Sequence, residues 1–159
     1  MKKILTVIAV LFTAQLFAQT HEIIKHDGEK IAINFIKIEG NIVFYSFPNS
    51  MEEQKISRYA VSKLNEIEKN NSKIVSERII LTQQSDYKKV VLLNESETIG
   101  LRKVDNLTSY LGIAKGETSI TKFKMGEMRL KQNAAKKGYQ FIVILFNNSE
   151  KMKAVAYTY

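Results

Sequence analysis

Hydrophobic and polar residues alternate with a period of two over the first half of the chain, which is the spacing of β-strands with one buried face. Ile31, Ile33 and Phe35 share one parity. The alternation slips at Ile36, so that Ile38 continues on the other parity. Such a slip predicts a β-bulge or a strong bend within one strand. We therefore expect a strongly bent strand in this region.

Turn signals divide the same region into short strands. Asp27 and Gly28 form a strong hairpin signal, Gly40 marks the next turn, and Pro48 stops the apolar run of residues 42–47. These turns predict a β-meander. Because a flat sheet of such short strands would bury too little apolar surface, we expect a small curled sheet or a barrel-like module.

The end of this region is less regular. A further strand is expected over residues 54–59. Val61, Leu64 and Ile67 then recur every three residues, which predicts a short helical turn leading into a last strand segment. Residues 68–73 are polar throughout and are the best candidate for a break between modules.

The clearest helix is expected between about Ser119 and Lys137. At about 100° per residue its apolar side chains share one face, and they are Ile120, Phe123, Met128, Leu130, Ala134 and Ala135. Glu127 and Lys131 are four residues apart and are predicted to pair along the edge of that face. Gly138 is a suitable residue to end the helix.

The second half of the chain predicts an antiparallel sheet against this helix. The apolar run of residues 141–146 indicates a central strand, and residues 151–159 alternate as a last strand. Other extended segments are expected over residues 78–82, 89–93, 98–104 and 110–114. The expected fold class is α+β: a small curled or barrel-like β module, then an antiparallel sheet with one packed amphipathic helix.

The N-terminus has the pattern of a secretory signal peptide. Lys2 and Lys3 form a basic start, an apolar run follows, and Ala18 is the small residue that signal peptidase needs. A membrane anchor is the alternative, but the apolar stretch of residues 4–18 is shorter than the roughly twenty residues of a spanning helix. Cleavage after Ala18 would leave Gln19 as the N-terminus, with no transmembrane segment, in the periplasm or outside the cell.

The expected domain organisation follows from these patterns. It comprises a signal peptide over residues 1–18, a small β module over residues 19–69, a linker over residues 70–74 and an α+β module over residues 75–159. The linker is placed there because no other stretch is comparably polar.

Composition excludes several kinds of chemistry. The chain has no cysteine, which excludes disulfides, thiolate metal sites and a lipid anchor on cysteine. The two histidines, His21 and His26, lie close to the expected mature terminus, and no nucleophile elbow, phosphate-binding loop or zinc-protease motif is present. We expect no cofactor. A hydrolase-like enzyme, with a site between the two modules that spacing does not reveal, is the alternative hypothesis.

One metal site can be proposed at the new N-terminus. The amine of Gln19, the amides of Thr20 and His21 and the His21 imidazole can surround Cu²⁺ or Ni²⁺ in a square plane. N-terminal glutamine cyclises readily, which removes the amine, and a histidine near a frayed terminus is common. The interpretation without a metal is therefore favoured.

Positive charge is concentrated in the second half of the chain. The protein carries a net charge of +8; residues 19–70 hold 7 Lys+Arg and 8 Asp+Glu, whereas residues 71–159 hold 15 and 8. Cations crowd the predicted helix, namely Lys122, Lys124, Arg129, Lys131, Lys136 and Lys137. Such a surface attracts anionic partners, for example lipid headgroups or acidic polysaccharides. The alternative is a solvated helix face in a basic protein. Export argues against intracellular nucleic acid as the partner.

The segment from Leu130 to Val143 resembles a helix-to-strand motif of small exported bacterial proteins, among them periplasmic lipoproteins and stress- or biofilm-associated proteins. In it, Ala134 and Ala135 precede Gly138 and an apolar strand follows. The chain departs from the lipoprotein versions because it lacks their cysteines. The resemblance implies an exported α+β fold without catalytic residues. We therefore expect a non-enzymatic binding or interaction module whose partner is an anionic envelope component or another envelope protein.

Overall fold

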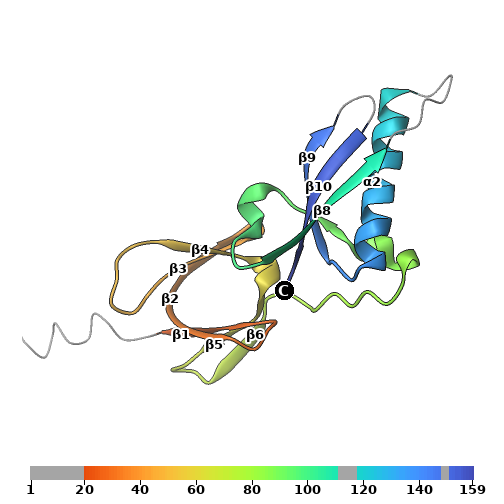
Figure 1. The fold of residues 1–159 in the computed structure, drawn as a ribbon. Helices are drawn as coiled ribbons and strands as arrows, with labels where there is room; N and C mark the ends of the chain where they lie inside the picture. The colour runs from red at the N-terminus through yellow and green to blue at the C-terminus, as the bar shows by residue number, and fades with distance from the viewer. Residues whose placement is uncertain (1–19, 111–117, 148–150) are drawn as a thin grey trace, which may run out of the picture. The chain divides into compact units, whose positions relative to one another are not determined.

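The computed structural model describes residues 20–110, 118–147 and 151–159. The chain divides into two compact units between Ser76 and Glu77. The N-terminal unit is built from strands, and the C-terminal unit combines a sheet with one long helix (Figure 1). This is the α+β class that the patterns predict, and each unit is described by itself below.

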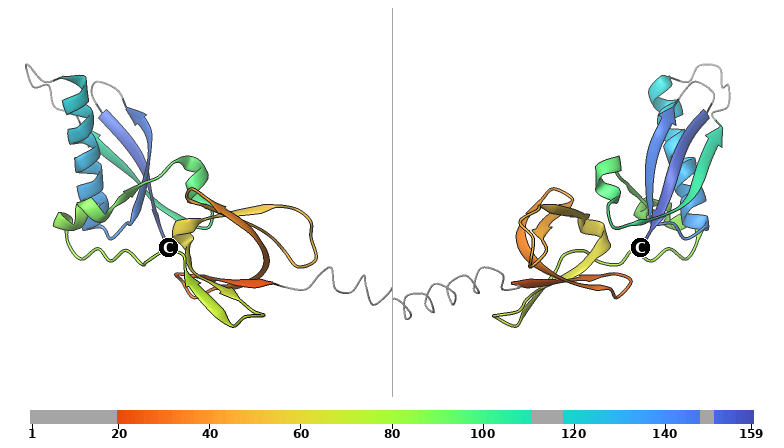
Figure 2. Two further views of the ribbon diagram at one scale, coloured as in Figure 1. Left: turned by 180° about the vertical axis from the view of Figure 1, so that it is seen from behind. Right: turned by 60° about the vertical axis from the view of Figure 1, so that its left-hand side comes forward.

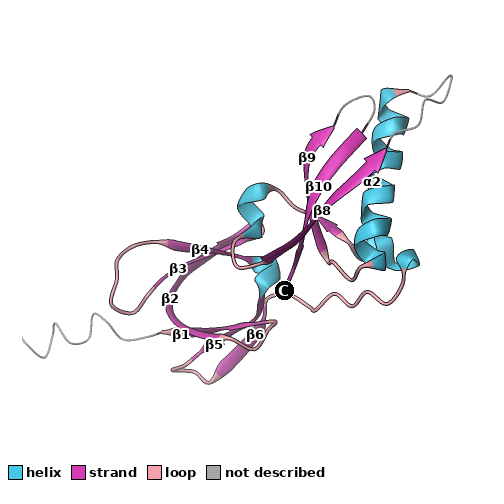
Figure 3. Cartoon of the chain, viewed as in Figure 1, coloured by secondary structure: helices cyan, strands magenta, loops and turns pink. Residues whose placement is uncertain are grey.

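The N-terminal unit is a six-stranded antiparallel sheet in the order β4-β3-β2-β1-β5-β6. The sheet is curled, as expected, but it is open rather than a closed barrel, since β4 and β6 form its two edges (Figure 3). A 3₁₀ helix over Arg58–Ala60 joins β4 to β5. The strands are β1 (His21–Lys25), β2 (Lys30–Glu39), β3 (Ile42–Ser46), β4 (Gln54–Ser57), β5 (Val61–Glu66) and β6 (Asn71–Ile74).

The predicted irregularity in β2 is confirmed. The register between β2 and β3 shifts between Phe35 and Lys37, so the extra residue in β2 is Ile36. The bulge lets one long strand pair with β1 at one end and with β3 at the other, which curls the sheet. Both predicted turns contain a glycine with positive φ, Gly28 at 92° and Gly40 at 56°, a conformation that glycine adopts without strain.

Two predictions for the N-terminal unit are corrected. Residues 61–66 form the strand β5, and the short helical turn precedes it instead of including Val61 and Leu64. Residues 71–74, expected as a linker, form β6, which pairs with β5 from Glu66↔Asn71 to Lys63↔Ile74. Every β6 side chain is exposed, so this strand has no apolar alternation by which it could be found.

The C-terminal unit contains a four-stranded sheet in the order β7-β9-β10-β8. Its strands are β7 (Val91–Leu92), β8 (Arg102–Tyr110), β9 (Phe141–Asn147) and β10 (Lys151–Thr158). The central position of β9 and the final strand β10 agree with the predictions. The sheet is mixed rather than antiparallel, because β7 runs parallel to β9.

Several expected strands of this unit are wrong. Residues 78–82 have no regular structure, and only Val91 and Leu92 of residues 89–93 belong to a strand. Residues 95–98 form a 3₁₀ helix, followed by a turn, and β8 begins at Arg102. Another 3₁₀ helix covers Gln84–Lys89. Of the segment expected over residues 110–114, only Tyr110 is among the described residues, and it ends β8.

The helix α2 (Ser119–Lys136) lies against one face of this sheet (Figure 2). The Thr118 side chain caps its start by accepting a hydrogen bond from the Thr121 amide. Lys137 caps the other end, and Gly138 follows with a φ of 75°, as predicted. Glu127 and Lys131 form the predicted ion pair, with 2.8 Å between Oε1 and Nζ.

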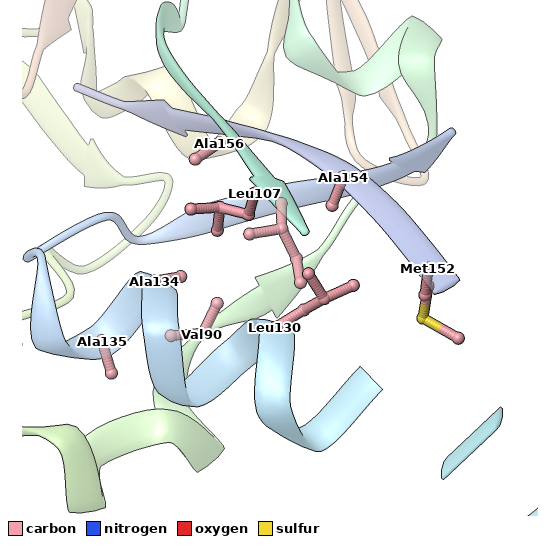
Figure 4. Close-up of a cluster of buried hydrophobic side chains, with 9 residues drawn as sticks. Val90, Leu107, Leu130, Ala134, Ala135, Met152, Ala154 and Ala156 are labelled. Atoms are coloured by element: carbon pink, nitrogen blue, oxygen red, sulfur yellow. The ribbon is translucent and has the colours of Figure 1, made fainter. Parts of the chain in front are cut away.

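The core between α2 and the sheet consists of small and branched side chains (Figure 4). Alanines on both sides, Ala134 on α2 and Ala154 and Ala156 on β10, let the helix lie close to the strand. Leu130 and Met152 are completely buried among them. The other members of the cluster are Val90, Leu107, Ala135 and Ile142.

The predicted apolar face of α2 is only partly buried. Leu130, Ala134 and Ala135 are covered, but Ile120 is 70% exposed, and Phe123 and Met128 are also exposed. The spacing of about 100° per residue identifies which side of the helix faces the sheet. It carries no information on where the sheet beneath the helix ends. The buried face is therefore confirmed for the C-terminal half of α2 and is wrong for its start.

Candidate functional site

Three of the six candidate cations form a line along the outer face of α2. Lys122, Arg129 and Lys136 are spaced seven residues apart, and residues at that spacing drift by only about 20° around a helix. Successive members of the line are separated by about 10.5 Å along the axis. The line runs about 120° around the helix from the buried Leu130 and Ala134. We call these three residues the outer basic line.

Two other candidates are held by carboxylates. Lys131 pairs with Glu127 at 2.8 Å, and Lys137 pairs with Asp105 of β8 at 2.7 Å. The hydrogen bond between Lys137 and Asp105 lowers the pKa of the Asp105 carboxyl and raises the pKa of the Lys137 ammonium. Both pairs neutralise the cation that they contain. The Lys137 pair therefore ties the end of α2 to β8, the Lys131 pair lies within α2, and both lysines contribute little to an anion-binding surface.

The cations of the outer basic line keep their charge. The Arg129 guanidinium donates a hydrogen bond to the backbone carbonyl of Tyr110, with 2.7 Å between Nη1 and oxygen. A carbonyl is neutral, so the contact orients Arg129 without cancelling its charge. Among the described residues, Lys122, Lys124 and Lys136 have no acidic partner. Lys124 lies apart from the line, two residues after Lys122 and about 200° around the helix.

The structure describes only two of the three residues of the proposed N-terminal metal site, Thr20 and His21. Gln19 lies outside the described residues. The Thr20 amide donates to the Ile33 carbonyl at 3.3 Å, and His21 is paired on both sides within the sheet. A square-planar metal would need both amides deprotonated and released from those contacts. Among the described residues, no group of three or more His, Asp and Glu side chains could hold a metal ion.

His26 and Ser76 form a pair that resembles part of a hydrolase site. The His26 Nε2 and the Ser76 Oγ are 2.9 Å apart. The Ser76 hydroxyl, however, donates to the Val61 carbonyl at 2.8 Å, so its proton is directed at that carbonyl and not at the imidazole. This arrangement does not direct the Ser76 proton to a base, as a nucleophilic serine requires. The two bonds tie Ser76, the last residue of the N-terminal unit, to β5 and to the turn after β1.

One feature of the N-terminal unit that was not predicted is an open concavity of ≈ 560 Å³ on the β1-β5-β6 face. Glu22 there accepts from the Asn65 amide at 3.2 Å, and Glu66 accepts from Lys69 at 2.6 Å. The two carboxylates that line the concavity, Glu22 and Glu66, therefore both accept hydrogen bonds from neighbouring side chains. Its lining residues are Glu22, Ile24, Lys63, Asn65, Glu66, Ile67, Asn70, Asn71 and Ser72. Many of them belong to the polar stretch around residue 70, which the hydrophobic pattern identified only as a break.

No protein-family model, no curated protein and no solved structure matches this chain. The resemblance to small exported proteins therefore stays a prediction. No helix among the described residues is both long and apolar enough to cross a membrane. The outer basic line offers positive charges and hydrogen-bond donors, which are groups that can interact with anions.

Proposed function

We propose that this protein is an exported, non-enzymatic binding module whose outer basic line contacts an anionic component of the cell envelope. The observation that carries the proposal is that Lys122, Arg129 and Lys136 share one face of α2 with no carboxylate partner among the described residues. Lipid headgroups, acidic polysaccharides and an acidic envelope protein all present the negative charge that such a line attracts.

The spacing of the outer basic line suits a polymer or a surface better than a small anion. Its cations are about 10.5 Å apart, close to the Debye length of about 10 Å at 0.1 M salt, so each acts nearly independently. One exposed ion pair contributes roughly 0.5 kcal/mol, and three together contribute about 1.5 kcal/mol, or about tenfold in affinity. A partner with repeated charges can engage all three.

Packing of α2 supports the proposal because it holds the line rigid. Leu130 and Ala134 are fully buried about 120° around the helix from the line, and Arg129 is fixed by its bond to Tyr110. Cations on a rigid element lose less conformational entropy on binding than cations on a loop. The alternative, a hydrolase-like enzyme, is less well supported, since the Ser76 hydroxyl beside His26 donates to the Val61 carbonyl and not to the imidazole.

A charge-neutralised variant tests this proposal. The triple substitution Lys122→Gln, Arg129→Gln and Lys136→Gln removes the outer basic line while retaining polar side chains of similar length. We expect its affinity for dextran sulfate, a soluble polyanion, to fall about tenfold, and the affinity of the wild type to decrease steeply with added salt. Fluorescence anisotropy of labelled dextran sulfate measures both effects.

A matched control uses three exposed cations elsewhere in the same unit. Lys88, Arg102 and Lys103 are also one arginine and two lysines, and no acidic partner holds them among the described residues. Their replacement by glutamine changes the net charge equally. Equal losses in the two triple variants would show that only net charge matters, and would refute a specific role for the outer basic line.

A further inference from the structure

The first turns of α2 extend past the end of the sheet. The Arg129 side chain contacts the carbonyl of Tyr110, the last residue of β8, and therefore marks where that strand ends. Ten residues separate Ser119 from Arg129, which corresponds to about 15 Å of helix. Figures 1 and 2 show these turns of α2 reaching beyond the ends of β9 and β10. We call residues 119–125 the overhang.

The overhang carries apolar side chains that no described strand covers completely. Ile120 is 70% exposed and Phe123 is 37% exposed. On the helical wheel they continue the same stripe that Leu130 and Ala134 bury against the sheet. The stripe therefore continues along all of α2, but its exposure rises toward the start of the helix, from Leu130 and Ala134 at 0% through Phe123 to Ile120.

The charge of the overhang is entirely positive. Lys122 and Lys124 alternate with the apolar residues, and residues 118–126 contain no Asp or Glu. Among the described residues neither lysine has an acidic partner. Long lysine side chains can extend from an apolar surface toward lipid phosphates while their methylene groups remain in the interface.

We propose that the overhang docks on the surface of an anionic lipid bilayer, with Ile120 and Phe123 entering the interface and Lys122 and Lys124 contacting headgroup phosphates. This inference rests on the proposed function and names its partner. A polysaccharide or another polyanion would satisfy the lysines but would leave both apolar side chains in water. A bilayer surface accommodates both, as for other amphipathic helices that lie in the interface. Burial of the two side chains would add to the electrostatic attraction.

The chain contains no tryptophan, so a single substitution provides a local probe. Phe123→Trp places one indole on the overhang, and Ile74→Trp places one on the exposed edge strand β6, where the native side chain is 64% exposed. The protein used is the chain from Gln19 onward, which contains every described helix and strand and lacks the apolar run of residues 4–18. That run would otherwise enter vesicles by itself.

The measurement is tryptophan emission on addition of vesicles made from equal parts of phosphatidylglycerol and phosphatidylcholine. We expect the emission of the Phe123→Trp protein to shift to the blue and to be quenched by brominated lipid, while the Ile74→Trp protein is unaffected. With vesicles of phosphatidylcholine alone the shift is expected to be much smaller, because the lysines lose their partners. No shift for Phe123→Trp, or equal shifts for both proteins, would overturn the inference.

A second variant separates this inference from the proposed function. The double substitution Ile120→Ser and Phe123→Ser is expected to weaken vesicle binding about tenfold and to leave dextran sulfate binding unchanged, since it removes apolar surface but no charge. If the double variant binds vesicles as the wild type does, the apolar contact is refuted and the outer basic line still stands. If the wild type binds neither vesicles nor dextran sulfate, both proposals fail.

Discussion

Lys131 and Lys136 lie on the same helix, but their surroundings give them different roles. Lys131 is only 21% exposed and is paired with Glu127, whereas Lys136 is exposed and has no acidic partner among the described residues. A cation already paired with a carboxylate must break that pair before it can bind a ligand. At the scale of single residues, the availability of each charge therefore determines the binding surface.

Two buried serines differ in what their hydroxyls contact, and this difference predicts opposite effects on stability. The Ser109 Oγ is buried and has no hydrogen-bond partner among the described residues, whereas the Ser57 Oγ accepts from the Tyr59 amide. We expect Ser109→Ala to leave the free energy of unfolding unchanged or to raise it by up to about 1 kcal/mol. Ser57→Ala should lower it by about 1 kcal/mol, since a helix cap is lost. Urea unfolding of both variants checks this, and a clear loss for Ser109→Ala would contradict it.

Asp86 predicts a dependence on acidic pH. The ammonium of Lys89 and the donors of Thr82 hold the pKa of the Asp86 carboxyl well below its usual value of 3.8. A lowered pKa in the folded state stabilises the fold above the unfolded value, and this contribution is lost as the pH falls below about 4. Asp86→Asn should remove this part of the pH dependence. Urea midpoints of both proteins between pH 7 and pH 2.5 are the measurement. Parallel curves would show that Asp86 contributes nothing.

The sequence predicts only in part which charged side chains form contacts within the protein. The Glu127–Lys131 pair was predictable because both residues lie on one helix at a fixed spacing. The Lys137–Asp105 pair and the Arg129–Tyr110 contact join residues 32 and 19 positions apart, so they depend on how α2 lies on the sheet. Six candidate cations therefore reduce to a line of three, with Lys124 on another side of the helix.

At the scale of elements, α2 depends on close packing through small side chains. Ala134 is completely buried between the helix and the sheet, so Ala134→Asp should lower the free energy of unfolding by several kcal/mol by placing a carboxylate there. Lys136→Asp, two residues away on the exposed side, should cost only about 0.3–1 kcal/mol through the helix dipole. Chemical denaturation compares them, and equal losses would mean that the buried face is wrongly assigned.

Elements that obey local rules were predictable, and those set by distant partners were not. The bulge in β2 and the end of α2 at Gly138 follow from apolar parity and glycine chemistry. The exposed edge strand β6 shows no apolar alternation, and the parallel pairing of β7 with β9 has no local signal. The exposure of Ile120 depends on where β8 ends, which the helix sequence does not contain.

At the scale of the whole molecule, the export hypothesis predicts a defined mature form. The apolar run before Ala18 should direct the chain across the inner membrane of a Gram-negative host, and cleavage should leave Gln19, free or cyclised, as the first residue. Intact-mass measurement of protein from the periplasmic fraction checks this. A full-length chain retained in the inner membrane would contradict it.

The most direct test of the central claim, that the outer basic line binds anionic partners, is to map the contact residue by residue. Nuclear magnetic resonance spectra of ¹⁵N-labelled protein, recorded during titration with dextran sulfate, report every backbone amide at once. We predict the largest shift changes at and beside Lys122, Arg129 and Lys136, and their disappearance at high salt. Changes centred on the N-terminal unit or around Lys88 and Lys103, or no changes at all, would contradict the account.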